Sequence, residues 1–222
     1  MFAACWSVKG GSGTTVVAAA LAVVLSRLDG PGALLVDLAG DGPAVLGLAE
    51  PDSPGLAGWL AAGAAVPADG LRRIEIPIDD RLGLIPRGVG PLASLERAEV
   101  LAGLFAAESR SVVVDAGVPI WEGDAADSVG AVLASAAVTS LLVTRACYLS
   151  LRRIVASPGR PSGIVLVTEP GRALGRHDVE QVSGVAVVAE VLVDPTVARA
   201  VDAGLLGGRL PRTLERALGR AT

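Results

Sequence analysis

The glycine-rich stretch "KGGSGTT", residues 9–15, constrains the fold more than any other part of this chain. It follows an apolar, strand-like run over residues 2–8 and leads directly into an apolar, helix-like run over residues 14–28. Its three glycines permit backbone angles that other residues resist, so that consecutive N–H groups can surround an anion. The N-terminus of the following helix adds its dipole at the same place. A strand, a glycine loop and a helix in this order predict a phosphate-binding site.

The rest of the chain alternates between short apolar runs and stretches rich in Ala and Leu. Runs such as "SVVVD" and "IVLVT" are continuously apolar, which is typical of strands buried on both faces of a parallel sheet. Hydrophobic residues make up 51% of the chain and aromatic residues only 3%, so the core must consist mainly of Ala, Val and Leu. We expect a single α/β domain over residues 1–222, with a doubly wound, mostly parallel sheet of seven or eight strands and helices on both faces.

The alternation also predicts where the elements lie. The expected strands are residues 2–8, 33–38, 73–78, 82–85, 111–115, 138–144, 163–168 and 185–191. The expected helices are residues 14–28, 56–62, 91–108, 123–136, 149–157, 195–203 and 213–218. The segment 41–70 has the loosest composition, and both a mobile lid and an ordinary surface loop are open interpretations of it.

The charge and the cysteine content limit the classes of protein to which this chain can belong. The formal net charge is -4 and the pI is about 5.1, which argues against unaided binding to nucleic acid. Cys5 and Cys147 have no metal-ligand spacing, and we expect both to stay reduced. The N-terminus lacks the basic residues that begin a secretory signal, and the apolar run after the glycine loop is too short to span a bilayer. The sequence predicts a soluble, cytoplasmic protein.

The glycine loop resembles the deviant phosphate-binding loop of the ParA/MinD family of P-loop ATPases, whose pattern is K-G-G-x-G-K-[ST]. Lys9 matches the family's signature lysine, which reaches across a dimer to the partner's nucleotide, and Thr15 matches the hydroxyl residue that binds magnesium. The resemblance implies a homodimer and ATP or ADP with Mg²⁺ as the ligand. The implied nucleotide contacts in the loop are Gly10, Gly11, Ser12, Gly13, Thr14 and Thr15, and those beyond the loop are Asp37, Asp115 and Thr168.

Thr14 departs from this pattern, because the family places there a lysine that contacts the β- and γ-phosphates. A hydrogen bond to a charged group is worth roughly 1.5–3 kcal/mol, so losing one contact weakens binding by roughly tenfold to a hundredfold. The loss also removes positive charge from the position where a transferred phosphoryl group needs it most. We therefore expect nucleotide binding to be weak, and hydrolysis to suffer more than binding.

Two further segments resemble the metal-binding and switch segments of that family. "SRSVVVDAG", residues 109–117, is similar to the Walker B strand, which implies that Asp115 holds magnesium through a water. "ALLVDLAGDGPAVLGL", residues 33–48, is similar to the second strand and first switch, where Asp37 matches the first aspartate of a V-D-x-D pattern and Ala39 replaces the second. That second aspartate polarises the attacking water in the family, and Asp41 is a candidate substitute. For Asp37 and Asp115, a structural role at a cap or turn is the alternative.

The resemblance extends to the region expected to hold the base. "GIVLVTEPGR", residues 163–172, occupies the place of the family's "VVNR" segment, in which an asparagine contacts the adenine edge. Thr168 and Glu169 stand here instead, so a base contact at Thr168 is implied while the identity of the base stays open. Residues 191–208 are similar to "IPxDxxVxxAxxxGxP", a segment that closes over the base in that family.

At the C-terminal end, "RLPRTLERALGR" places Leu210, Leu214 and Leu218 four residues apart, with three arginines at the same spacing. This pattern predicts a short basic amphipathic helix. Such a helix can dock on anionic lipid, as in MinD-like proteins, or pack its leucines on its own domain. The first alternative would place the protein at the inner face of the membrane.

The replacements at Thr14, Ala39 and Thr168 favour a degenerate member of the ParA/MinD family with weak or no ATP hydrolysis. The chain is most similar to the CpaE/TadZ branch, which implies a localisation or assembly factor. Its partner would belong to pilus, secretion or cell-positioning machinery. Two alternatives stay open: an active ATPase in which Lys9 replaces the missing loop lysine, and a DNA-partitioning factor, which the acidic pI disfavours.

Overall fold

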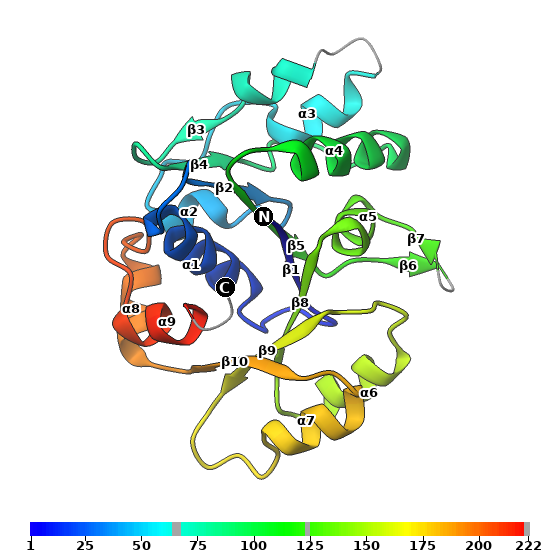
Figure 1. Ribbon diagram of the computed structural model, residues 1–222, viewed down its shortest axis with the longest axis vertical. Coiled ribbons are helices and arrows are strands. Elements are labelled where there is room, and N and C mark those ends of the chain that lie inside the picture. Colours follow the sequence, from blue (N-terminus) through cyan, green and yellow to red (C-terminus); the bar gives the residue numbers. More distant parts are fainter. Residues whose placement is uncertain (64–67, 123–124, 220–222) are drawn as a thin grey trace.

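The computed structural model describes residues 1–63, 68–122 and 125–219. An eight-stranded sheet crosses the molecule, with strand order β10-β9-β8-β1-β5-β2-β4-β3 (Figure 1). Every neighbouring pair is parallel except β3 and β4, which are antiparallel. The predicted fold class, a doubly wound and mostly parallel sheet with helices on both faces, is confirmed.

The strands of this sheet are short. They are β1 (Phe2–Trp6), β2 (Ala33–Asp37), β3 (Ile76–Pro77), β4 (Leu82–Ile85), β5 (Ser111–Gly117), β8 (Thr139–Arg145), β9 (Gly163–Thr168) and β10 (Val187–Leu192). A separate antiparallel ribbon is formed by β6 (Trp121–Glu122) and β7 (Ala125–Ala126).

The connections are mostly helical. The helices are α1 (Thr14–Arg27), α2 (Gly42–Leu46), α3 (Gly55–Ala61), α4 (Leu95–Ala107), α5 (Val129–Ala136), α6 (Tyr148–Ala156), α7 (Arg176–Ser183), α8 (Pro195–Asp202) and α9 (Arg212–Leu218), with a 3-10 helix at Ala68–Arg73.

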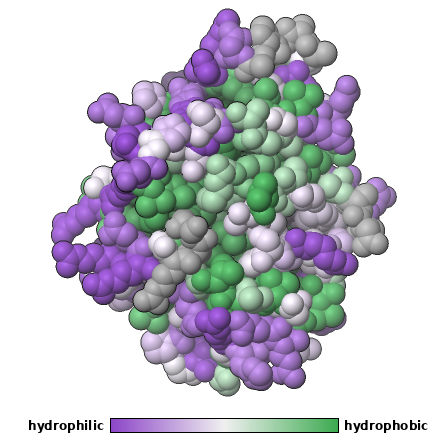
Figure 2. All heavy atoms as spheres, in the orientation of Figure 1, coloured by the Kyte–Doolittle hydropathy of each residue, from purple (hydrophilic) through white to green (hydrophobic). Residues whose placement is uncertain are grey.

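Two hydrophobic clusters flank the sheet. Successive residues of β5 show the alternation, because Val113 faces one cluster while Val112 and Val114 face the other. The α1 cluster, on the first face, is formed by α1, α2, α9 and the residues that pack on them. The α4 cluster, on the second face, draws on α3, α4, α5 and α7. Figure 2 shows that hydrophilic residues gather near α8 at the left margin of the molecule and near α7 at its lower margin.

Several predicted elements differ from the structure. The strand expected over residues 73–78 is only Ile76–Pro77, because a 3-10 helix runs to Arg73. Pro77 has no N–H group to donate to a neighbouring strand, which suits it to an edge strand such as β3. The helix expected over 91–108 begins only at Leu95, where the Ser94 hydroxyl accepts a hydrogen bond from the Arg97 amide. Of the helix expected over 123–136, residues 123–124 lie outside the described part, 125–126 form a strand, and α5 begins after Ser128.

The segment 41–70 is not an open loop where the structure describes it. It contains α2 and α3, and the α3 side chains of Leu56, Trp59 and Leu60 are buried in the α4 cluster; residues 64–67 lie outside the described part. Gly47, at the end of α2, packs against Gly204, just beyond α8. A Cβ atom added to Gly47 would lie 2.0 Å from the Gly204 carbonyl oxygen, so only glycine permits this approach.

The C-terminal helix packs on its own domain. Leu210, Leu214 and Leu218 are buried in the α1 cluster, and α9 contacts both α1 and β10. The apolar face that the lipid-docking alternative requires is therefore covered in this structure; Arg220 lies outside the described residues. Within the described ranges, no helix combines the length and apolar character needed to cross a bilayer.

Candidate phosphate-binding site

The glycine loop joins the end of β1 to the start of α1. Gly11 and Gly13 have φ angles of 74° and 90°, a region in which residues with a Cβ atom are strained. The Ser12 hydroxyl donates to the Lys9 carbonyl at 3.0 Å and fixes the curve of the loop. The helical ladder of α1 starts with Val17, whose amide donates to the Gly13 carbonyl at 3.0 Å. The amides of the preceding turn therefore have no acceptor among the described residues, and they are free to bind an anion.

Asp115 lies on β5, beside β1, and pairs in register with Cys5. The residue is 1% exposed. Its Oδ1 atom accepts a hydrogen bond from the Gly117 amide at 3.1 Å, whereas its buried Oδ2 atom has no hydrogen-bond partner in the described chain. Burial raises the pKa of Asp115 to about 6, although the neighbouring Thr15 hydroxyl offsets part of the shift. A carboxylate oxygen with free capacity next to a hydroxyl suits a hard cation such as Mg²⁺.

Asp37 is completely buried at the end of β2. Its Oδ1 atom accepts hydrogen bonds from the amides of Ala39 at 2.9 Å and Gly40 at 2.7 Å, and its Oδ2 atom accepts one from the Gly42 amide at 2.8 Å. Burial raises the pKa of Asp37, and these amides lower it. The carboxylate thus holds the turn that leads into α2, as the structural alternative expected. A nucleotide contact at Asp37 stays a prediction.

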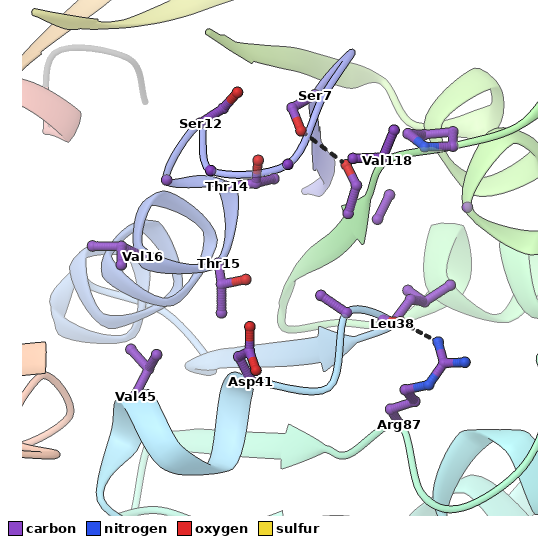
Figure 3. Close-up of a pocket in the computed structure, with 18 of the residues that line it drawn as sticks. Ser7, Ser12, Thr14, Thr15, Val16, Leu38, Asp41, Val45, Arg87 and Val118 are labelled. Atoms are coloured by element: carbon purple, nitrogen blue, oxygen red, sulfur yellow. Dashed lines mark hydrogen bonds between the residues drawn. The ribbon is translucent and has the colours of Figure 1, made fainter. Parts of the chain in front are cut away.

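A cavity of about 1040 Å³ opens beside the glycine loop and is walled by the segments that follow β2, β4 and β5. Every residue from Gly10 to Val16 lines it. Figure 3 shows the side chains of Thr15 and Asp41 pointing toward one another across the cavity, with Arg87 on the opposite wall. The Arg87 guanidinium donates to the Leu38 carbonyl (Figure 3). This volume is at the upper end of what ligand pockets usually offer.

The charges of this cavity are unevenly distributed. Asp41 and Asp202 are its acidic lining residues, and Arg87 is the one basic residue that lines it among the residues described. The described chain contains no group of three or more His, Cys, Asp or Glu side chains placed to hold a metal ion. Mg²⁺ does not require such a group, because it is commonly bound through one or two carboxylates together with substrate phosphates.

Lys9 and Thr168 belong to a different, smaller cavity of about 230 Å³. The Lys9 ammonium donates to the Gly10 carbonyl at 3.2 Å. Arg145 shares this cavity and pairs with Glu169 at 2.6 Å. The Thr168 hydroxyl donates to the Val191 carbonyl at 3.5 Å. The predicted loop residues Gly10 to Thr15 thus line the large cavity and Lys9 and Thr168 the small one, whereas Asp37 and Asp115 line neither. The roles of all of them toward a nucleotide stay predictions.

One contributor to the large cavity was not predicted, and another was implied only by the family resemblance. Arg87 stands just after β4, at the carboxyl edge of the sheet where ligands bind in this architecture. That position was the signal that could have identified it. The other contributor is α8, whose Val201 and Asp202 line the cavity. Both lie within residues 191–208, the segment that the family resemblance implied would close over the base.

No protein-family model matches the chain, and no curated protein sequence matches it. Solved structures do match its fold. A ParA family ATPase from Chlorobium tepidum TLS has a TM-score of 0.78 and 22% identity, over 98% of this chain and 95% of that chain. A chain of the MinC:MinD cell division protein complex from Aquifex aeolicus has a TM-score of 0.72 and 16% identity, over 100% and 96%. The septum site-determining protein MinD from Pyrococcus horikoshii OT3, complexed with Mg-ADP, has a TM-score of 0.72 and 19% identity, over 99% and 94%. The chain thus has the fold of these ParA/MinD-type ATPases.

Proposed function

We propose that this chain binds ATP or ADP together with Mg²⁺, weakly, in the cavity beside the glycine loop, and acts as a nucleotide-dependent localisation or assembly factor. The observation that carries the proposal is the Oδ2 atom of Asp115, which is buried without a partner next to Thr15. A buried carboxylate oxygen without a hydrogen bond costs free energy unless a ligand satisfies it.

Each part of the site has a role in this proposal. The free amides of the first turn of α1 bind the phosphates, and the dipole of that helix favours their negative charge. The Thr15 hydroxyl and Asp115 hold Mg²⁺, with Asp115 acting through a water. When bound, Mg²⁺ neutralises charge on the phosphate oxygens. The MinD structure from Pyrococcus horikoshii, complexed with Mg-ADP, supports this ligand class by similarity of fold.

The replacements at Thr14 and Ala39 support weak or absent hydrolysis. We place the chain within the ParA/MinD family as a degenerate member of the CpaE/TadZ branch, with residues 1–222 as one cytoplasmic domain. In this role it forms a homodimer and recruits a protein of pilus, secretion or cell-positioning machinery. The MinC:MinD complex supports the general idea, since that protein of the same fold binds a partner.

An active ATPase is the second candidate, and Asp41 favours it. Asp41 lines the cavity and points toward Thr15 (Figure 3). A carboxylate in that position can polarise a water molecule, which is the task that Ala39 cannot perform. Phosphate release by the wild type that disappears in Asp41→Asn, with nucleotide binding retained, would establish this candidate over the pseudo-ATPase.

Calorimetric titration with ATP and ADP, each with and without Mg²⁺, tests the proposal, and sedimentation velocity reports the assembly state. We expect weak binding that depends on Mg²⁺, with Thr15→Val losing most of that dependence. Thr139→Val is the matched control, because this threonine begins β8 and lies outside both cavities. Absence of binding at millimolar nucleotide would reject the proposal and favour a scaffold that uses no ligand.

A further inference from the structure

The large cavity contains a charge imbalance that the sequence alone leaves unexplained. Thr14 removes the cation from the glycine loop, and the lining of the cavity adds the carboxylates of Asp41 and Asp202. A nucleoside triphosphate would bring further negative charge to this place. Besides the loop amides and Mg²⁺, a cation from elsewhere in the chain would offset this negative charge and strengthen phosphate binding.

Its position makes Arg87 the candidate for this cation. It is the one basic residue lining the cavity in the described ranges, and it stands on the wall opposite the glycine loop (Figure 3). One guanidinium N–H group donates to the Leu38 carbonyl. Its remaining N–H groups have no acceptor in the described chain, and no described carboxylate forms an ion pair with it. The half-buried side chain is thus oriented by one contact and keeps donors free for a ligand.

The backbone around Arg87 is fixed. The Arg87 carbonyl accepts a hydrogen bond from the Ala57 amide at 2.9 Å, and the Pro86 carbonyl accepts one from the Leu56 amide at 2.9 Å. Gly88 packs so closely on Pro54 that an added Cβ atom would lie 2.1 Å from the Pro54 carbonyl oxygen. Arg87 therefore projects from a rigid backbone segment, so less conformational entropy is lost when its side chain binds a ligand.

Lys9, the alternative cation, is placed differently. It lines the smaller cavity rather than the large one, and its ammonium donates to the Gly10 carbonyl at 3.2 Å. Within one chain, Lys9 is thus directed away from the wall that Arg87 occupies. The geometry favours Arg87 over Lys9 as the compensating charge.

The strand order indicates which phosphate Arg87 would contact. The predicted base contact, Thr168, is at the end of β9, on one side of β1, whereas Arg87 follows β4, on the other side. With the base at Thr168 as predicted, a nucleotide that extends across the glycine loop has its terminal phosphate on the Arg87 side of β1.

We propose that Arg87 binds the terminal phosphate of a nucleoside triphosphate and replaces the missing loop lysine, so that it sets the preference for ATP over ADP. This inference rests on the proposed function. Arg87 presents a planar donor group suited to phosphate oxygens. It acts from the switch side of the cavity, because it also holds the Leu38 carbonyl.

Calorimetric titration of the full chain with Mg-ATP and Mg-ADP tests the inference, using the variants Arg87→Gln, Thr14→Lys and the double variant. We expect Arg87→Gln to weaken Mg-ATP binding by about tenfold to a hundredfold, as loss of a charged hydrogen bond predicts, and Mg-ADP binding by much less. Thr14→Lys should restore Mg-ATP binding in the Arg87→Gln background. Arg209→Gln, an exposed arginine outside the large cavity, is the matched control.

The outcomes separate the inference from the function on which it rests. If the wild type binds neither nucleotide, the proposed function fails and the inference fails with it. If the wild type binds Mg-ATP and Arg87→Gln binds it equally well, only the inference is overturned. If Arg87→Gln weakens both nucleotides equally and Thr14→Lys does not restore binding, Arg87 merely clamps the Leu38 carbonyl, which also overturns the inference. Far-UV circular dichroism of each variant verifies that it is folded.

Discussion

At the scale of single residues, the carboxyl edge of the sheet contains two buried aspartates that differ in their hydrogen-bond partners. Asp37 accepts hydrogen bonds from three backbone amides, two on Oδ1 and one on Oδ2, so its carboxylate holds the turn that follows β2. Asp115 keeps one oxygen without a partner. The sequence predicted a nucleotide contact for Asp37 and a magnesium contact for Asp115, and both of these roles stay predictions. The structure shows Asp37 holding a turn and one oxygen of Asp115 without a partner in the described chain.

The titration of Asp115 should be visible in the stability of the protein. Because its folded pKa of about 6 lies above the ordinary value of 3.8, the folded chain binds more protons than the unfolded chain between those two pH values. The free energy of unfolding therefore falls as pH rises through this window, by up to about 3 kcal/mol from this group. Asp115→Asn should lack this contribution, as measured by urea unfolding at pH 4 and pH 7.5.

The matched control for this experiment is Asp29→Asn, since Asp29 is exposed. The difference in unfolding free energy between the wild type and Asp115→Asn should change with pH by more than the difference between the wild type and Asp29→Asn. Parallel pH curves for all three proteins would contradict the assignment of a raised pKa to Asp115.

Replacement of Asp37 should lower the free energy of unfolding of the whole domain, and not only alter the candidate phosphate-binding site. Asp37→Ala leaves three amides without an acceptor, and unpaired buried groups cost about 1–3 kcal/mol each, so we expect a loss of about 3 kcal/mol or more. Asp37→Asn keeps an acceptor oxygen and should lose less. Urea unfolding at neutral pH measures both variants. A loss below about 1 kcal/mol for Asp37→Ala would show that the turn does not need this carboxylate.

At the scale of elements, the connection from β1 through the glycine loop to α1 was predictable because all of its signals are local in sequence. A short apolar strand, three glycines and a long apolar helix follow one another without interruption. The helix α7 was not predicted, since only Val179 of its eight residues is buried and all the others except the exposed Val182 are polar. A helix that contributes so little to the core has almost no apolar periodicity to detect.

The contribution of Arg87 could not be predicted for a different reason. Its contact with the Leu38 carbonyl joins residues that are 49 positions apart. Such a contact depends on which strands become neighbours in the sheet, here β2 and β4. Local patterns therefore predicted the fold class and the loop, whereas the opposite wall of the cavity required the strand order.

Within the loop, Gly13 and Gly10 should respond differently to alanine. Gly13 has a φ angle of 90°, and an added Cβ atom would lie 3.8 Å from Val167, which is ordinary contact. The effect of Gly13→Ala should thus come from backbone strain alone, about 1–2 kcal/mol. Gly10→Ala meets no atom within 4 Å and is the control. Urea unfolding measures both, and equal stability of the two variants would contradict a strained left-handed conformation at Gly13.

At the scale of the whole molecule, the two hydrophobic clusters pack against opposite faces of one sheet. Strands such as β5 contribute alternate side chains to both clusters, so neither cluster can persist when the sheet is lost. This shared sheet supports the proposal that residues 1–222 act as one domain, although unfolding intermediates become more common at this chain length.

We expect one cooperative unfolding transition. Trp6 and Trp59 belong to the α4 cluster, and Trp121 stacks edge-on against Trp6 with ring centroids 6.1 Å apart. Tryptophan fluorescence therefore reports on one face of the sheet, whereas far-UV circular dichroism reports on the helices of both faces. Coincident urea transitions by the two signals would support a single unit, and separated midpoints would indicate that the faces unfold independently.

The contact between Gly47 and Gly204 connects the lining of the large cavity to the helix α8. It joins the end of α2, whose Ala44 and Val45 line the large cavity, to the end of α8, whose outer residues face solvent. No side chain separates the two backbones, so a shift of one helix displaces the other directly. If the proposed ligand shifts α2, a protein bound only to the exterior of α8 would therefore respond to that ligand without touching it.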